Sequence, residues 1–64
     1  MKANGARIRE LREAKPLGLN AMAGMVGINR NNLSQLERDQ KTASRETLER
    51  IADLLGAPFE EIAA

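Results

Sequence analysis

Residues 29–38 concentrate side chains whose hydrogen-bonding groups have a fixed geometry. The segment is NRNNLSQLER, in which amide, guanidinium and hydroxyl groups surround only two leucines. Asn and Gln amides match the N6 and N7 edge of adenine, and an Arg guanidinium matches O6 and N7 of guanine. The chemistry available to this segment is therefore hydrogen bonding to a polar partner such as the edge of a nucleic-acid base.

The groups that most enzymes use for covalent chemistry are absent. The chain has no cysteine and no histidine, which excludes disulfides, thiolate nucleophiles, imidazole bases and the usual zinc ligands. No glycine-rich phosphate loop or cluster of metal ligands accompanies its carboxylates. Its 64 residues can bury only about 60% of the surface of the unfolded chain, which leaves one small core. We therefore expect a single domain over residues 1–64 that is not an enzyme and binds no metal, cofactor or small-molecule ligand.

The charges are unevenly distributed along the chain. Residues 1–45 carry nine basic and four acidic side chains, a net charge of +5, whereas residues 46–64 carry one basic and five acidic side chains, a net charge of −4. Such a polarity can orient a domain on a polyanion, although ordinary solvated helix faces would also produce it. No apolar run approaches the ~18 residues of a membrane span, and residues 1–4 lead into a charged stretch without a signal-peptide core. We expect a cytoplasmic protein without membrane contact.

The elements that position these side chains are all predicted to be helices. Apolar residues recur at helical spacing and never alternate with a period of two, so we expect no strand. Pro16 ends the first helix, Gly27 the second and Gly56 the fourth, while Asn29 and Ser44 are suited to cap the third and fourth. The helices are expected at residues 4 to 15, 19 to 26, 30 to 38, 45 to 55 and 59 to 63. The chain is thus predicted to be a compact all-α domain of four to five helices.

Residues 19–38 fit two helices that cross at a steep angle through a three-residue turn. Ala23 allows the two helices to approach closely, and Gly27 supplies a positive φ that a side chain would resist. The junction is expected to bury four apolar side chains, those of Val26, Ile28, Leu33 and Leu36. Such a pair leaves the third helix on the surface with its N-terminal half projecting, and a helix in that position fits a major groove about 12 Å wide.

Three stretches carry a resemblance to a known family: RIRELREAK at residues 7–15, AGMVGINRNNLSQLER at 23–38 and ASRETLERIADLLGAPFEEI at 43–62. Together they resemble the Cro/repressor type of helix-turn-helix domain, the XRE-like family of transcriptional regulators. The resemblance implies a lambda-repressor-like bundle of five helices that binds double-stranded DNA, with the helix-turn-helix at the second and third helices.

The resemblance also implies roles for the side chains of the third helix. Arg30 and Asn31 match the start of the recognition helix, where side chains contact base edges, and Gln35 lies one turn further along the same face. Asn32 and Ser34 are further candidates for contact with bases or phosphates. Each matched pair of side chain and base contributes ~1–3 kcal/mol of discrimination. The alternative is that residues 29–32 only cap and solvate a helix end.

Phosphate contacts are expected from side chains that flank the third helix, because such contacts fix the position of a domain on DNA without sequence preference. The candidates are Asn20, Arg38, Gln40, Lys41 and Arg45. Arg12 and Glu37 match a pair that joins the first and third helices in the family. Glu37 is therefore interpreted as a structural acceptor, and Asn29 as a structural N-cap.

The sequence departs from the family pattern at three places. Gly18 and Leu19 stand where the family usually has Ser or Thr followed by Gln, so one phosphate contact is missing, although backbone amides there can still meet a phosphate. The outward side of the second helix is apolar, with Ala21, Gly24 and Met25. Asp39 replaces a usual Gly; it tolerates a left-handed conformation, but its charge near a phosphate would be unfavourable.

Two functions remain open from the sequence. The first is a transcriptional regulator, a repressor that acts as a homodimer on an inverted repeat with half-sites about one helical turn apart. Its dimer contact is expected to be weak and to involve the C-terminal region. The second is a protein-interaction module on the same scaffold, antitoxin-like or antiactivator, whose protein partner binds the apolar second helix or the end formed by Phe59 and Ile62.

Overall fold

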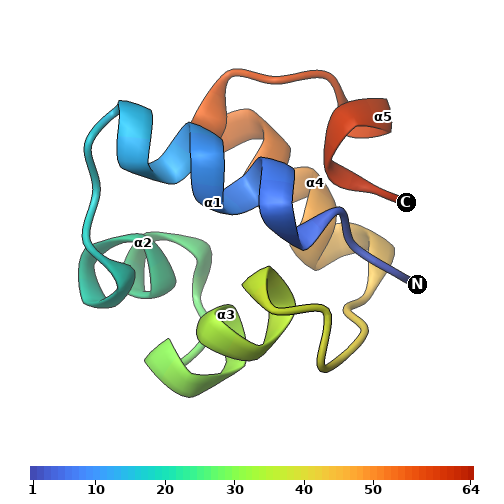
Figure 1. Ribbon diagram of the computed structural model, residues 1–64, viewed down its shortest axis with the longest axis horizontal. Helices are drawn as coiled ribbons and strands as arrows, with labels where there is room; N and C mark the ends of the chain where they lie inside the picture. Colours follow the sequence, from blue (N-terminus) through green and yellow to red (C-terminus); the bar gives the residue numbers. More distant parts are fainter.

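The computed structural model describes residues 1–64 and contains five helices, in agreement with the all-α prediction (Figure 1). The helices are α1 (Gly5–Ala14), α2 (Leu19–Val26), α3 (Arg30–Glu37), α4 (Arg45–Leu55) and α5 (Phe59–Ile62). In Figure 1, α2 and α3 lie on one side of α1, α4 lies behind α1, and α5 lies near the two chain termini. None of these helices is both long enough and apolar enough to cross a membrane.

Local signals in the sequence set the helix ends. The side chains of Asn4, Asn29 and Ser44 each accept a hydrogen bond from the backbone N–H three residues later, at 3.2, 2.8 and 3.1 Å. Each cap satisfies one of the N–H groups that a first helical turn leaves without a partner. Gly27 and Gly56 end α2 and α4 with φ of 90° and 67°. The predicted caps of the third and fourth helices are thus confirmed.

A single cluster of twelve buried apolar residues forms the core. Its members are Ala3, Ile8, Met22, Ala23, Val26, Leu33, Leu36, Leu48, Ile51, Ala52, Leu55 and Ile62. Leu11, Ile28 and Phe59 only pack against this cluster and stay partly exposed. Every helix contributes to the cluster, so the orientation of α3 depends on packing against the rest of the chain.

The N-terminal segment pairs with the C-terminal segment, which the helical pattern did not predict. Ala3 and Ala63 form an isolated antiparallel bridge. The N–H of Asn4 donates to the carbonyl of Ile62 at 2.7 Å. Ala3 is only 3% exposed, so this pairing adds a buried residue that precedes the first helix.

Candidate nucleic-acid interface

A tight turn joins α2 to α3. The N–H groups of Gly27 and Ile28 both donate to the carbonyl of Ala23, at 2.9 and 3.0 Å. Bonds from the residues just after a helix to a carbonyl of its last turn are typical of a helix that ends at a left-handed residue. Ala23 is only 2% exposed, and its small side chain permits the close approach of the two helices. The turn therefore fixes the angle at which α3 leaves α2.

One side of α3 packs into the core, and the other side faces solvent. Leu33 and Leu36 are buried in the core, whereas Arg30 and Asn31 are exposed. Gln35 is half-buried and lies four residues after Asn31, so the two amides share one face of the helix. The side chains of Arg30, Asn31 and Gln35 form no hydrogen bond within the protein, in contrast to Asn29, Asn32 and Glu37. Their donors and acceptors remain available to an external partner.

A buried ion pair fixes α3 against α1. Arg12 Nε and Nη2 donate to the two carboxylate oxygens of Glu37 at 2.6 and 3.0 Å, and Arg12 Nη1 donates to the carbonyl of Leu17 at 2.8 Å. The side chains are 10% and 5% exposed. The hydrogen bonds with Glu37 raise the pKa of Arg12 above its ordinary value. This is the pair that the resemblance implies, and together with the buried Leu33 and Leu36 it holds α3 in its orientation.

Asp39 follows α3 and contacts the beginning of α1. It has a left-handed φ of 57°, and its Oδ1 accepts a hydrogen bond from the N–H of Gly5 at 3.1 Å. A carboxylate is favourable at a helix N-terminus, where backbone N–H groups carry partial positive charge. One carboxylate oxygen of Asp39 thus caps the start of α1, while the residue itself stays exposed.

Three of the five cations without an ion pair lie in α3 or in the connection after it, and the other two are Lys2 and Lys15. Five arginines pair with glutamates, namely Arg7, Arg9, Arg12, Arg45 and Arg50. Arg30, Arg38 and Lys41 form no ion pair, although Arg38 Nε donates to the carbonyl of Ser34 at 3.3 Å. Because Glu37 is buried against Arg12, these three cations face only the exposed carboxylate of Asp39, and the surface of α3 and of the connection that follows it is net positive.

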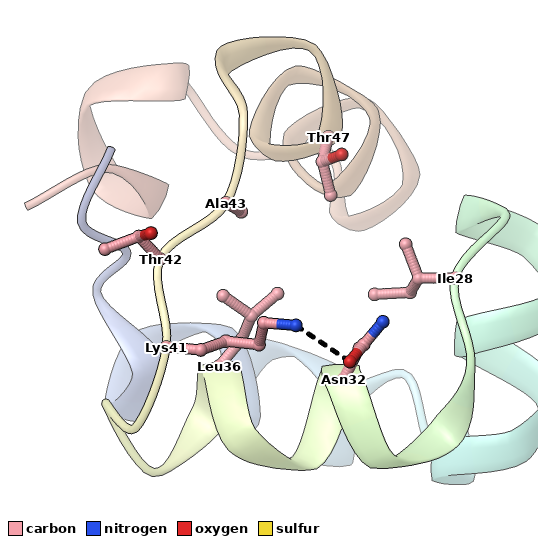
Figure 2. Close-up of a pocket in the computed structure, with 7 residues that line it drawn as sticks. All are labelled: Ile28, Asn32, Leu36, Lys41, Thr42, Ala43 and Thr47. Carbon is pink, nitrogen blue, oxygen red and sulfur yellow. Dashed lines mark hydrogen bonds between the residues drawn. The ribbon is translucent and has the colours of Figure 1, made fainter.

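A pocket lies between α3, the connection after it and α4. Figure 2 shows its lining residues, which are Ile28, Asn32, Leu36, Lys41, Thr42, Ala43 and Thr47. Lys41 Nζ donates to Asn32 Oδ1 at 2.8 Å across the edge of the pocket. Asn32 is half-buried, and its nitrogen points away from Lys41 in this view.

Two predicted phosphate contacts are placed differently from the rest. Asn20 is exposed in the first turn of α2, on a different helix from the residues that flank the end of α3. The Arg45 guanidinium lies 4.6 Å from the centroid of the Phe59 ring, and its Nε donates to Glu49 at 3.3 Å. Arg45 thus contacts residues of the C-terminal half of the chain while its side chain stays 66% exposed, and Arg38, Gln40 and Lys41 are exposed beside α3.

The structure shows what the residues at the start of α2 do in place of the usual phosphate contact. Gly18 has no side chain with which to cap the helix, and Leu19 is partly buried against the core. The position that usually contacts DNA thus contributes to packing.

Two contacts at this interface were not predicted from the sequence, namely Lys41 with Asn32 and Asp39 with Gly5. No group of three or more His, Cys, Asp or Glu residues that could hold a metal ion is present.

Comparisons with known proteins agree with this geometry. Residues 5–64 match a family described as a helix-turn-helix domain. Among solved structures, the restriction-modification controller protein C.AhdI from Aeromonas hydrophila is 33% identical with a TM-score of 0.81. The clp gene regulator ClgR from Corynebacterium glutamicum is 33% identical with a TM-score of 0.83. An HTH_3 family transcriptional regulator from Vibrio cholerae is 32% identical with a TM-score of 0.77.

The matched structures differ in length from this chain. Each alignment covers 89% of this chain, and it covers 83% of C.AhdI, 61% of ClgR and 32% of the Vibrio cholerae regulator. The last two thus contain substantial further chain outside the matched region. No curated protein sequence matches this chain.

Proposed function

Because the chain belongs to the helix-turn-helix domain family of DNA-binding regulators, we propose that it binds double-stranded DNA with α3 in the major groove. The observation that carries this proposal is the outward side of α3. Arg30 and Asn31 are exposed, Gln35 is half-exposed, and none of the three side chains has a hydrogen-bond partner within the protein. Polar side chains on a helix that the fold holds in place, and that have no hydrogen-bond partner within the protein, are suited to contact base edges.

Base preference comes from these three side chains. Arg30 pairs with guanine, and Asn31 and Gln35 pair with adenine, each at ~1–3 kcal/mol of discrimination. Ser34, half-buried on the same helix, is a lesser candidate for contact with a base or phosphate. Arg30 lies in the first turn and Gln35 in the second, so the contacted base pairs are neighbours within one half-site.

Affinity comes from the cations and amides beside α3. Arg38 and Lys41 have no ion-pair partner, and Gln40 is exposed between them. Asn20 is exposed at the first turn of α2, where free backbone N–H groups favour an anion. These groups contact phosphates and so place α3 in register without selecting a sequence.

The protein acts as a repressor that binds an inverted repeat as a homodimer in the cytoplasm. The neighbours that are called a controller protein, a gene regulator and a transcriptional regulator support a regulatory role. Ile62 is fully buried in the core and Phe59 only partly exposed, so the C-terminal region offers a small contact surface. Small interfaces bind weakly, and dimerisation is therefore assisted by DNA.

Selection of bound duplexes from a random pool tests this proposal. The expected result is a motif with two inverted half-sites about one helical turn apart. Alanine at Arg30, Asn31 and Gln35 should relax the base preference, whereas Lys41→Ala should weaken binding to all duplexes and reduce the salt slope by ~1 unit. Absence of duplex binding at low salt across the pool would refute the proposal.

A second candidate function is supported by the exposed side of α2. Met25 is 62% exposed, and Ala21 and Gly24 on the same helix are also exposed. A protein partner, as of an antitoxin or antiactivator, would cover this apolar side. A stable partner captured by the wild-type protein but not by Met25→Glu would favour this function, and retention by that variant would argue against it.

A further inference from the structure

The hydrogen bond between Lys41 and Asn32 links α3 to the connection that follows it. Lys41 Nζ lies 2.8 Å from Asn32 Oδ1, and the two residues are nine positions apart. It is the one bond between a side chain of this connection and a side chain of α3. In Figure 2 the Lys41 chain extends from the connection past Leu36 to reach Asn32. The ammonium is therefore held beside the second residue after the exposed Arg30.

The backbone on both sides of Lys41 is also fixed. The N–H of Gln40 donates to the carbonyl of Gln35 at 2.8 Å, and the N–H of Ala43 donates to the carbonyl of Met1 at 2.9 Å. The N–H of Asn32 is itself capped by Asn29 at 2.8 Å. Both ends of the bond between the side chains thus rest on a constrained backbone. A lysine side chain ordinarily loses much rotamer freedom when it binds a partner. Here the bond to Asn32 removes part of that freedom before DNA binds.

The bond also determines what Asn32 offers to DNA. Its side-chain oxygen, the acceptor needed for a bidentate contact with adenine, already accepts from the ammonium. Lys41 has three N–H donors, of which Asn32 engages one. No carboxylate pairs with Lys41, so its positive charge remains available. The two side chains together present donors and a positive charge, which suits a phosphate rather than the adenine edge that Asn would otherwise match.

We propose that Asn32 is a positioning residue whose side-chain oxygen holds the Lys41 ammonium at the flank of α3, so that the phosphate contact of Lys41 is ordered before DNA binds. This inference rests on the proposed DNA-binding function and assigns Asn32 a role different from base contact. Asn32 then affects affinity for every duplex to the same extent, and it does so only while Lys41 is present.

A double-mutant cycle on the full chain tests the assignment. Wild type, Asn32→Ala, Lys41→Ala and the double variant are titrated by fluorescence anisotropy against the duplex recovered by selection and against an unrelated duplex of equal length. Asn32→Ala should weaken both complexes by roughly 3- to 10-fold, the factor expected for ordering one flexible side chain. In the Lys41→Ala background the same substitution should change neither affinity. Circular dichroism of each variant verifies the fold.

The salt dependence separates positioning from other roles. Asn32→Ala keeps the Lys41 charge and should leave the salt slope unchanged, whereas Asn32→Asp adds a carboxylate that neutralises Lys41 and should reduce the slope by ~1 unit. Independent effects of Asn32→Ala and Lys41→Ala, or a base preference altered at one position by Asn32→Ala, would overturn the inference while leaving the proposed function intact. Failure of the wild-type protein to bind either duplex would overturn both.

Discussion

Replacement of Glu37 by alanine tests whether the ion pair between α1 and α3 stabilises the fold. Glu37 accepts two hydrogen bonds from Arg12, at 2.6 and 3.0 Å, and its side chain is only 5% exposed. In Glu37→Ala the Arg12 guanidinium keeps the carbonyl of Leu17 as its one remaining partner. Removal of one member of a buried ion pair lowers the free energy of unfolding by about 3–5 kcal/mol, because the other charge stays buried without compensation.

A loss of that size is large for this chain. Stabilities of about 0.05–0.15 kcal/mol per residue correspond to about 3–10 kcal/mol for a domain of this length. With an m-value of about 1 kcal/mol per M of urea, the unfolding midpoint of Glu37→Ala should fall by about 3 M or more. Urea titration followed by circular dichroism measures this shift. If the wild-type midpoint lies below about 3 M urea, the variant should be unfolded in buffer without urea.

Two further variants make the test specific. Glu49→Ala removes an exposed pair with Arg45, whose side chains are 51% and 66% exposed, and should lower the free energy of unfolding by no more than about 0.5 kcal/mol. The double variant Arg12→Met, Glu37→Leu removes both buried charges and should regain most of the stability. If Glu37→Ala is no less stable than Glu49→Ala, the role assigned to the buried pair is wrong.

Three other substitutions probe contacts that position α3 or the helix after it, each measured by urea unfolding. A Cβ at Gly5 would lie 2.4 Å from the Leu36 carbonyl oxygen, so Gly5→Ala should cost about 1–3 kcal/mol as α1 and α3 move apart; an unchanged midpoint would contradict this. Asp39→Ala should cost about 1–3 kcal/mol, since it loses the bond to Gly5 and strains a left-handed φ, and Asp39→Asn should recover most of the loss. Ser44→Ala should cost about 1 kcal/mol through loss of the α4 cap, and Ser44→Thr should be nearly neutral.

Helix positions could be predicted because their signals are local. Asn29 and Ser44 bond to the backbone three residues later, and Gly27 needs its positive φ within the same turn. A pattern of apolar residues with helical spacing therefore identifies both the extent and the inward side of each helix. The same local pattern predicts that Arg30 and Asn31 are exposed, because Leu33 and Leu36 must face the core.

Contacts between distant segments had no comparable signal. Gly5 and Asp39 are 34 positions apart, and neither residue type by itself indicates the other. The bridge between Ala3 and Ala63 involves main-chain groups, which any residue provides, so no pattern of side chains predicts it. Arg45 was expected beside a phosphate, which stays a prediction, and no pattern in the sequence indicated that its guanidinium would lie over the Phe59 ring. Each of these outcomes depends on tertiary packing that local propensity does not encode.

The burial of the Glu37 carboxylate couples the stability of this fold to the electrostatics of α3. Glu37 is buried against Arg12, and Asp39 bonds to the first N–H of α1. If Glu37 faced outward, it would lie near the cations of Arg38 and Lys41 and weaken their attraction for a phosphate. The ion pair that fixes α3 to α1 therefore also keeps the charge of Glu37 away from the surface proposed to meet DNA. Substitutions that separate α1 from α3, such as Gly5→Ala, should for this reason weaken DNA binding even under conditions in which the variant remains folded.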